Sequence, residues 1–136
     1  MSNLLKNQIQ YTVACISEFA QSKSLTKKQA FMYLLEYKAL AFLEEFYDVE
    51  HTLSFEKELK LSKQEQLIEY ITSDIVSFIM EEKNISMIEA MQRLYSSETF
   101  SKLNDIETGL YVESPTYVYD IYKTEKQNGQ IIQEEI

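Results

Sequence analysis

Proton transfer near neutral pH has one side-chain candidate in this sequence, the single histidine His51. It lies in segment 47–52, YDVEHT, where Asp48 could orient the imidazole ring. Catalysis would also require a nucleophile or a substrate pocket, and the sequence contains no nucleophile motif. The alternative is that His51 donates to free carbonyl groups at the end of a helix. We therefore predict a structural turn and no catalytic residue; the turn consists of Tyr47, Asp48, His51 and Thr52.

Metal and redox sites are not indicated by the remaining polar residues. Neighbouring carboxylates such as Glu81 and Glu82 are frequent, but none has the spacing of a calcium loop around a glycine. A di-metal helical bundle needs two Glu-x-x-His pairs, which one histidine cannot supply. The lone Cys15 excludes a cysteine zinc site and suits a reducing compartment. We expect no metal, no cofactor and no enzymatic activity.

The charge of the chain is acidic and unevenly distributed. The 136 residues suffice for one domain and carry 13 basic and 22 acidic side chains, a net charge of −9. Residues 1–60 contribute −1 and residues 61–136 contribute −8. Nucleic-acid binding needs clustered Lys and Arg, and a membrane span needs a longer apolar run than any here. We expect a cytoplasmic protein whose partner is a basic protein, with no nucleic acid and no membrane.

Two halves of the chain align with each other at an offset of 59 to 60 residues. Along the long first helices, the aligned residues are Ile9, Tyr11, Ile16 and Phe19 with Ile68, Tyr70, Ile75 and Phe78. After a one-residue gap, each half has a helix start of the same type, Thr26 followed by Gln29 and Ser86 followed by Glu89. We interpret the halves as two copies of one three-helix unit, 4–60 and 63–110.

Apolar residues at intervals of three to four predict the helices that carry these features. The expected helices span about 5–20, 27–37 and 39–47 in the first half and about 67–79, 87–95 and 98–104 in the second. Segment 109–114 is expected to be a loop or a short extended piece, and Ser114-Pro115 opens a last helix, 115–125. The prediction is an all-α fold, a compact bundle of about seven helices in a single domain, 1–125, followed by a mobile tail, 126–136.

Tyrosine is the most over-represented side chain, with ten copies. Tyr suits protein interfaces because it combines a large apolar ring with a hydroxyl group. The alternative is that the tyrosines only cover the end of the bundle. Because the second half is also acidic, we expect a partner protein to bind there; the expected contact residues are Asp105, Glu107, Tyr111, Tyr117 and Tyr119.

Two segments resemble a family of small bacterial proteins of uncharacterised function. The turn Tyr47-Asp48-x-x-His51-Thr52 resembles the motif that closes a helical segment in that family, and segment 24–31 resembles the start of its middle helix. The second half, with Asp105-x-x-Thr108-Gly109, is similar to a related type. Genes of this family often lie beside genes for ADP-ribosyltransferase-like proteins, in arrangements like toxin–antitoxin modules. The resemblance implies a partner-binding or neutralising role and supplies no catalytic residues.

Three functions are compatible with these features of the sequence. The first is a non-enzymatic interaction module, antitoxin-like, that masks a partner encoded by a neighbouring gene. The alternative is an acidic inhibitor that mimics nucleic acid and blocks a defence or nucleic-acid-binding protein. The third is an enzyme that uses His51 in a pocket at the end of the third helix. The chain would act as a monomer or a homodimer, and two internal copies could replace a dimer of shorter relatives.

Overall fold

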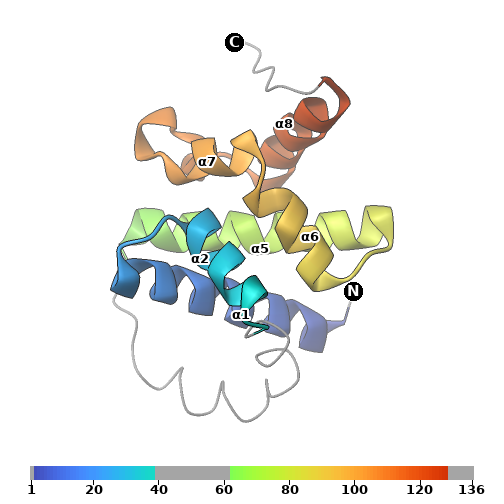
Figure 1. Ribbon diagram of the computed structural model, residues 1–136. Coiled ribbons are helices and arrows are strands. Elements are labelled where there is room, and N and C mark those ends of the chain that lie inside the picture. Colours follow the sequence, from blue (N-terminus) through green and yellow to red (C-terminus); the bar gives the residue numbers. More distant parts are fainter. Residues whose placement is uncertain (1, 39–61, 129–136) are drawn as a thin grey trace. The chain divides into compact units, whose positions relative to one another are not determined.

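The computed structural model describes residues 2–38 and 62–128. Six α-helices and two short 3-10 helices make up the regular structure of these residues, which contain no strand (Figure 1). The predicted all-α class is confirmed. The predicted helix 39–47, the turn at Tyr47, Asp48, His51 and Thr52, and residues 129–136 of the predicted tail lie outside the described residues.

The chain divides into two compact units, residues 1–62 and 63–136. The first unit contains α1 (Asn3–Lys23) and α2 (Lys27–Glu36), which pack against each other. The Ser2 hydroxyl caps α1 by accepting from the Leu5 amide at 3.1 Å. The predicted single domain over 1–125 requires the two units to pack together, and it stays a prediction.

The second unit is organised around α5 (Lys63–Lys83), which packs against α6, α8 and η2 (Figure 1). Its other elements are α6 (Met87–Tyr95), α7 (Glu98–Asn104), η1 (Ile106–Thr108), η2 (Leu110–Val112) and α8 (Pro115–Asn128). One stripe of α5 is fully buried because its isoleucines recur every three to four residues, at Ile68, Ile71, Ile75 and Ile79. Burying each of these side chains contributes roughly 1.5–3 kcal/mol.

The corner between the long and the short helix has the same geometry in both units. Ser24 (φ 56°) and Asn84 (φ 53°) end the long helices in the left-handed conformation. Two residues later Thr26 and Ser86 cap the short helices, accepting from the Gln29 amide at 3.1 Å and the Glu89 amide at 3.2 Å. At Thr26 the predicted capping box is complete. Both predicted helix starts are therefore confirmed, at an offset of 60.

Side chains inside the long helices do not follow the alignment at every position. Tyr11 and Tyr70 align at an offset of 59, yet Tyr11 is 2% exposed and Tyr70 is 55% exposed. α1 and α5 end at positions 60 residues apart, and a shift of one residue rotates a side chain by about 100° around a helix. The two units thus resemble each other more in the corners than along the long helices.

Segment 109–114 is not the loop or extended piece that the sequence predicts. Two 3-10 helices, η1 and η2, occupy 106–112, joined by Gly109 in the left-handed conformation (φ 71°). The Thr108 hydroxyl donates to the Lys102 carbonyl at 2.6 Å, which fixes η1 to the end of α7. Ser114 caps α8 as predicted, by accepting from the Tyr117 amide at 3.1 Å. α8 continues to Asn128, beyond the predicted end at residue 125.

Candidate functional site

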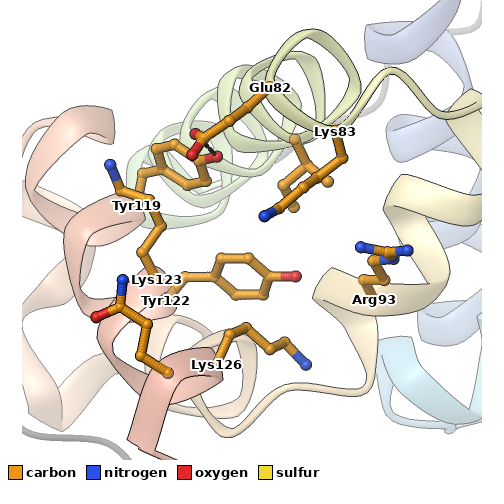
Figure 2. Close-up of a pocket in the computed structure, with 9 residues that line it drawn as sticks. Glu82, Lys83, Arg93, Tyr119, Tyr122, Lys123 and Lys126 are labelled. Atoms are coloured by element: carbon orange, nitrogen blue, oxygen red, sulfur yellow. Dashed lines mark hydrogen bonds between the residues drawn. The ribbon is translucent and has the colours of Figure 1, made fainter.

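A pocket of about 450 Å³ lies within the second unit, where the end of α5 meets α6 and α8 (Figure 2). α5 contributes Ile79, Glu82 and Lys83, and α6 contributes Arg93. The remaining wall comes from one side of α8, between Tyr119 and Gln127. A pocket of this volume is of the size that holds a small molecule.

The lining of this pocket is basic although the chain is acidic. Its cations are Lys83, Arg93, Lys123 and Lys126, and its one carboxylate is Glu82. Residues 63–128 contain six basic and twelve acidic side chains, so most of the basic ones but only one acid line the pocket. We name this set of side chains, together with Tyr119 and Tyr122, the basic pocket.

Glu82 is engaged by a neighbour at the edge of the basic pocket. The Tyr119 hydroxyl donates to its carboxylate, and Figure 2 shows both groups turned toward each other. The Tyr119 ring is 7% exposed and packs against Phe78 and Tyr122, with centroids at 5.3 and 6.0 Å. Burial, and then the bond to Glu82, raise the pKa of Tyr119, so its hydroxyl keeps the proton that it donates.

Tyr122 places a neutral donor in the middle of the cations. Figure 2 shows its ring between Lys83 and Lys126, with the hydroxyl directed toward Arg93. The Lys126 Nζ lies 5.3 Å from the centroid of this ring. Burial raises the pKa of Tyr122 to about 12, against the opposing effect of the Arg93 charge. The hydroxyl is therefore protonated at neutral pH and can donate into the pocket.

Three of the four pocket cations have no carboxylate within ion-pair distance in the described part of the chain. Lys123 is the exception, because its Nζ lies 3.6 Å from the Asp120 carboxylate and 4.8 Å from the Tyr119 ring centroid. Lys83, Arg93 and Lys126 are exposed. Their charges are thus available to a ligand.

A carboxylate on α8 fixes the α8 wall of the pocket relative to α7. Glu125 accepts from the amides of Glu98 and Thr99, both at 2.9 Å, and from the Thr99 hydroxyl at 2.6 Å. Burial alone would raise the pKa of Glu125, but these hydrogen bonds hold it below its usual value. Glu125 caps the N-terminal end of α7 from a distant part of the sequence.

The five predicted contact residues differ in exposure. Asp105 and Glu107 are exposed on η1 and lie together, since the Asp105 Oδ1 accepts from the Glu107 amide at 3.1 Å. Tyr111 and Tyr117 are half-buried. Tyr119 is buried and lines the basic pocket, so it does not offer an exposed ring.

Aliphatic side chains accompany the exposed carboxylates of η1 and η2. Ile106 is 45% exposed and Val112 is 67% exposed. The carboxylates of Asp105, Glu107 and Glu113 come from adjacent positions and are also exposed. We name this group the acidic turn surface; its members are Asp105, Ile106, Glu107, Val112 and Glu113.

The basic pocket was not predicted from the sequence, although the spacing of residues on α8 could have indicated its α8 side. Tyr119 and Tyr122, and likewise Lys123 and Lys126, are three residues apart on one helix, which places each pair on one side of α8. Lys83 and Arg93 come from other helices, and only the packing of the second unit brings them to the same place.

Within residues 2–38 and 62–128, no group of three or more His, Cys, Asp or Glu side chains is arranged to hold a metal ion. None of the helices in those ranges combines the length and apolar character that a membrane span requires. Cys15 is half-buried on α1.

Comparison with known proteins places the first half of the chain beside one family. No curated protein and no solved structure matches the chain. Residues 10–60 match the family model described as protein of unknown function (DUF3791). The matched segment corresponds to the first predicted repeat, 4–60, and includes the predicted turn at 47–52. Over residues 10–60 the chain is therefore similar to a family of proteins of unknown function.

Proposed function

We propose that this chain is a non-enzymatic protein-interaction module that binds and masks a basic partner protein through the acidic turn surface. The observation that carries the proposal is the exposure of Ile106 and Val112 at positions adjacent in sequence to three exposed carboxylates. Apolar side chains inside a polar rim are typical of protein interfaces. The carboxylates would accelerate encounter with a basic partner, and the aliphatic side chains would supply affinity on contact.

The backbone of the acidic turn surface is held in place before any partner binds. The Gly109 amide donates to the Ile106 carbonyl at 3.1 Å, and the Glu113 amide donates to the Leu110 carbonyl at 3.0 Å. Leu110 is buried and anchors η2 against α5. Binding would therefore require little additional ordering of the chain, which favours affinity.

We propose further that the chain contains two copies of one helical unit and that one copy masks the partner protein. The recurring corners at Ser24 and Asn84 support two copies of one helical unit, 4–60 and 63–110, of which the family match covers the first. The resemblance to proteins encoded beside ADP-ribosyltransferase-like proteins supports a partner from a neighbouring gene. The acidic turn surface belongs to the second copy, so this copy would carry the contact.

The test begins by capturing partners on the tagged full-length chain in extracts of its source cells. A captured protein is identified by mass spectrometry, purified and titrated against three forms of the chain. These are the wild type, Glu107→Lys with Glu113→Lys, and the control Glu36→Lys with Glu81→Lys. The control changes net charge equally, at exposed positions near helix C-termini where lysine is favourable.

We expect the Glu107→Lys, Glu113→Lys variant to bind at least about tenfold more weakly than the wild type, and the control to bind like the wild type. Equal binding by all three forms would overturn the assignment to the acidic turn surface. The absence of any stoichiometric protein partner would overturn the masking role. Displacement of the partner by duplex DNA would instead support the nucleic-acid mimic.

A further inference from the structure

We propose that the basic pocket binds a small organic phosphate that carries two or three negative charges. This site is separate from the acidic turn surface and does not depend on the proposed masking role, because the two share no residue. The lining carries four cations and one carboxylate, and one of the cations, Lys123, is paired with Asp120 outside the lining, which leaves an excess of two positive charges.

Gathering these cations is unfavourable unless an anion joins them. Like charges that share one cavity repel each other, and water screens part of this repulsion because Lys83, Arg93 and Lys126 are exposed. The chain has twelve acidic side chains in residues 63–128 that could have been placed beside them. Glu82 alone reaches the pocket, and the Tyr119 hydroxyl engages its carboxylate. An anionic ligand would supply the missing counter-charge.

The directions from which the donors approach favour a phosphate over a carboxylate. Lys83, Arg93 and Lys126 come from three different helices, α5, α6 and α8 (Figure 2). A planar carboxylate is satisfied by one guanidinium from one side, whereas the tetrahedral oxygens of a phosphate accept from several directions. The protonated Tyr122 hydroxyl adds a neutral donor between the cations.

Part of the lining suits an organic group attached to the phosphate. The apolar part of the wall comes from Tyr122, which is 5% exposed, and from Ile79 beneath the surface, which is 1% exposed. A volume of about 450 Å³ exceeds what a lone phosphate ion requires and lies in the usual range for small-molecule sites. The geometry therefore favours a phosphorylated small molecule over the free ion.

The test titrates the full-length chain by calorimetry, at low ionic strength, with inorganic phosphate, pyrophosphate, adenosine diphosphate, sulfate and a short RNA. We expect heat from the diphosphates, with adenosine diphosphate the tighter, and a loss of affinity as salt is added. The single variants Arg93→Gln and Lys126→Gln should each weaken binding by about tenfold. Both residues are exposed, so the fold should survive, which circular dichroism checks.

The chain offers a matched control for the loss of charge. Lys63 and Lys102 are the two basic residues of 63–128 outside the pocket lining, and both are exposed. The Lys63→Gln, Lys102→Gln variant should bind adenosine diphosphate like the wild type. Tyr122→Phe should weaken this binding roughly two- to tenfold, because only the hydroxyl is lost.

Several results would overturn the inference. These are the absence of heat with every phosphate, equal affinity for sulfate, or a loss in the Lys63→Gln, Lys102→Gln variant as large as in Arg93→Gln. Tighter binding of a short RNA than of adenosine diphosphate would assign the pocket to nucleic acid instead. Equal affinity for pyrophosphate and adenosine diphosphate would show that the organic group does not contribute to binding. The ligand would then be an inorganic polyphosphate.

Discussion

The basic pocket and the acidic turn surface lie in the same unit, yet their charged side chains are placed by different means. In the acidic turn surface, Asp105, Glu107 and Glu113 are close in sequence, and local hydrogen bonds such as Asp105 to the Glu107 amide fix them. In the basic pocket, Lys83, Arg93 and Lys126 come from three helices far apart in sequence. The first surface depends on local backbone geometry and the second on helix packing.

Because of this difference, substitutions at different positions should weaken binding at each region. α5 packs against both η2 and α8, so a change in its core affects the two regions together. A change at the α7–α8 junction should affect the pocket more, and a change at Gly109 should affect the acidic turn surface more. Substitutions at these positions should therefore distinguish the two regions.

A cavity in the core stripe of α5 should lower the stability of the whole second unit, and so of both regions. Ile75 is fully buried, so Ile75→Ala should lower the free energy of unfolding by about 2–5 kcal/mol. Leu67→Ala, at an exposed position of the same helix, should change it by less than about 0.5 kcal/mol. Urea unfolding followed by circular dichroism measures both. Similar losses for the two variants would show that the stripe of α5 is not the core of the unit.

Removing the Glu125 cap should affect the pocket side of the unit selectively. Glu125→Gln loses charge-assisted bonds to Glu98 and Thr99 and should lower the free energy of unfolding by about 1–2 kcal/mol at pH 7. Its effect on adenosine diphosphate binding combines the loosening of α8, which supplies five of the nine lining residues, with the loss of a negative charge beside Lys126. Asp120→Asn, which loses only a surface ion pair, should leave stability nearly unchanged.

The contribution of Glu125 should depend on pH in a defined direction. Its pKa is lower in the folded state than the usual value of 4.5, so the charged form stabilises the fold. This stabilisation is complete above pH 4.5 and is lost as the pH falls through the lowered pKa. The stability difference between wild type and Glu125→Gln should therefore shrink on acidification. A difference that stays constant down to pH 2 would contradict the role of the charge.

Gly109 offers a change confined to the acidic turn surface. A Cβ at this position meets no atom within 4 Å, so only the backbone conformation, φ 71°, opposes Gly109→Ala. The left-handed conformation costs a non-glycine residue about 1 kcal/mol. Partner binding should weaken while adenosine diphosphate binding stays unchanged. Equal effects on both titrations would remove the distinction between the two regions.

The same contrast explains what the sequence predicts and what it does not. Helix starts at Thr26, Ser86 and Ser114 are visible because each depends on a hydroxyl and an amide three residues apart. Asp105 and Glu107 were predicted as contact residues from the acidic charge of the second half, and both are exposed. η1 and η2 were not expected, because they depend on the left-handed Gly109 and on a bond from Thr108 back to α7.

The basic pocket could not be predicted from residue spacing along one helix, because three helices contribute to its lining. Tyr119 was expected at a partner interface, but its burial depends on Phe78 of α5, which the sequence does not place beside it. In the same way, the Glu125 cap joins residues 26 positions apart, Thr99 and Glu125, and no local motif indicates such a bond. Features that several helices create together required the structure.

The smallest expected effect concerns the one carboxylate of the basic pocket. If the Tyr119 hydroxyl holds the Glu82 carboxylate away from the cations, then Tyr119→Phe should release the carboxylate toward them and weaken adenosine diphosphate binding severalfold. Glu82→Gln should instead strengthen binding by a similar factor, and it should abolish the effect of Tyr119→Phe in the double variant. This cycle measures the coupling between the two side chains directly. Additive effects would show that Glu82 acts independently of Tyr119, and that the excess of positive charge in the pocket does not depend on that hydrogen bond.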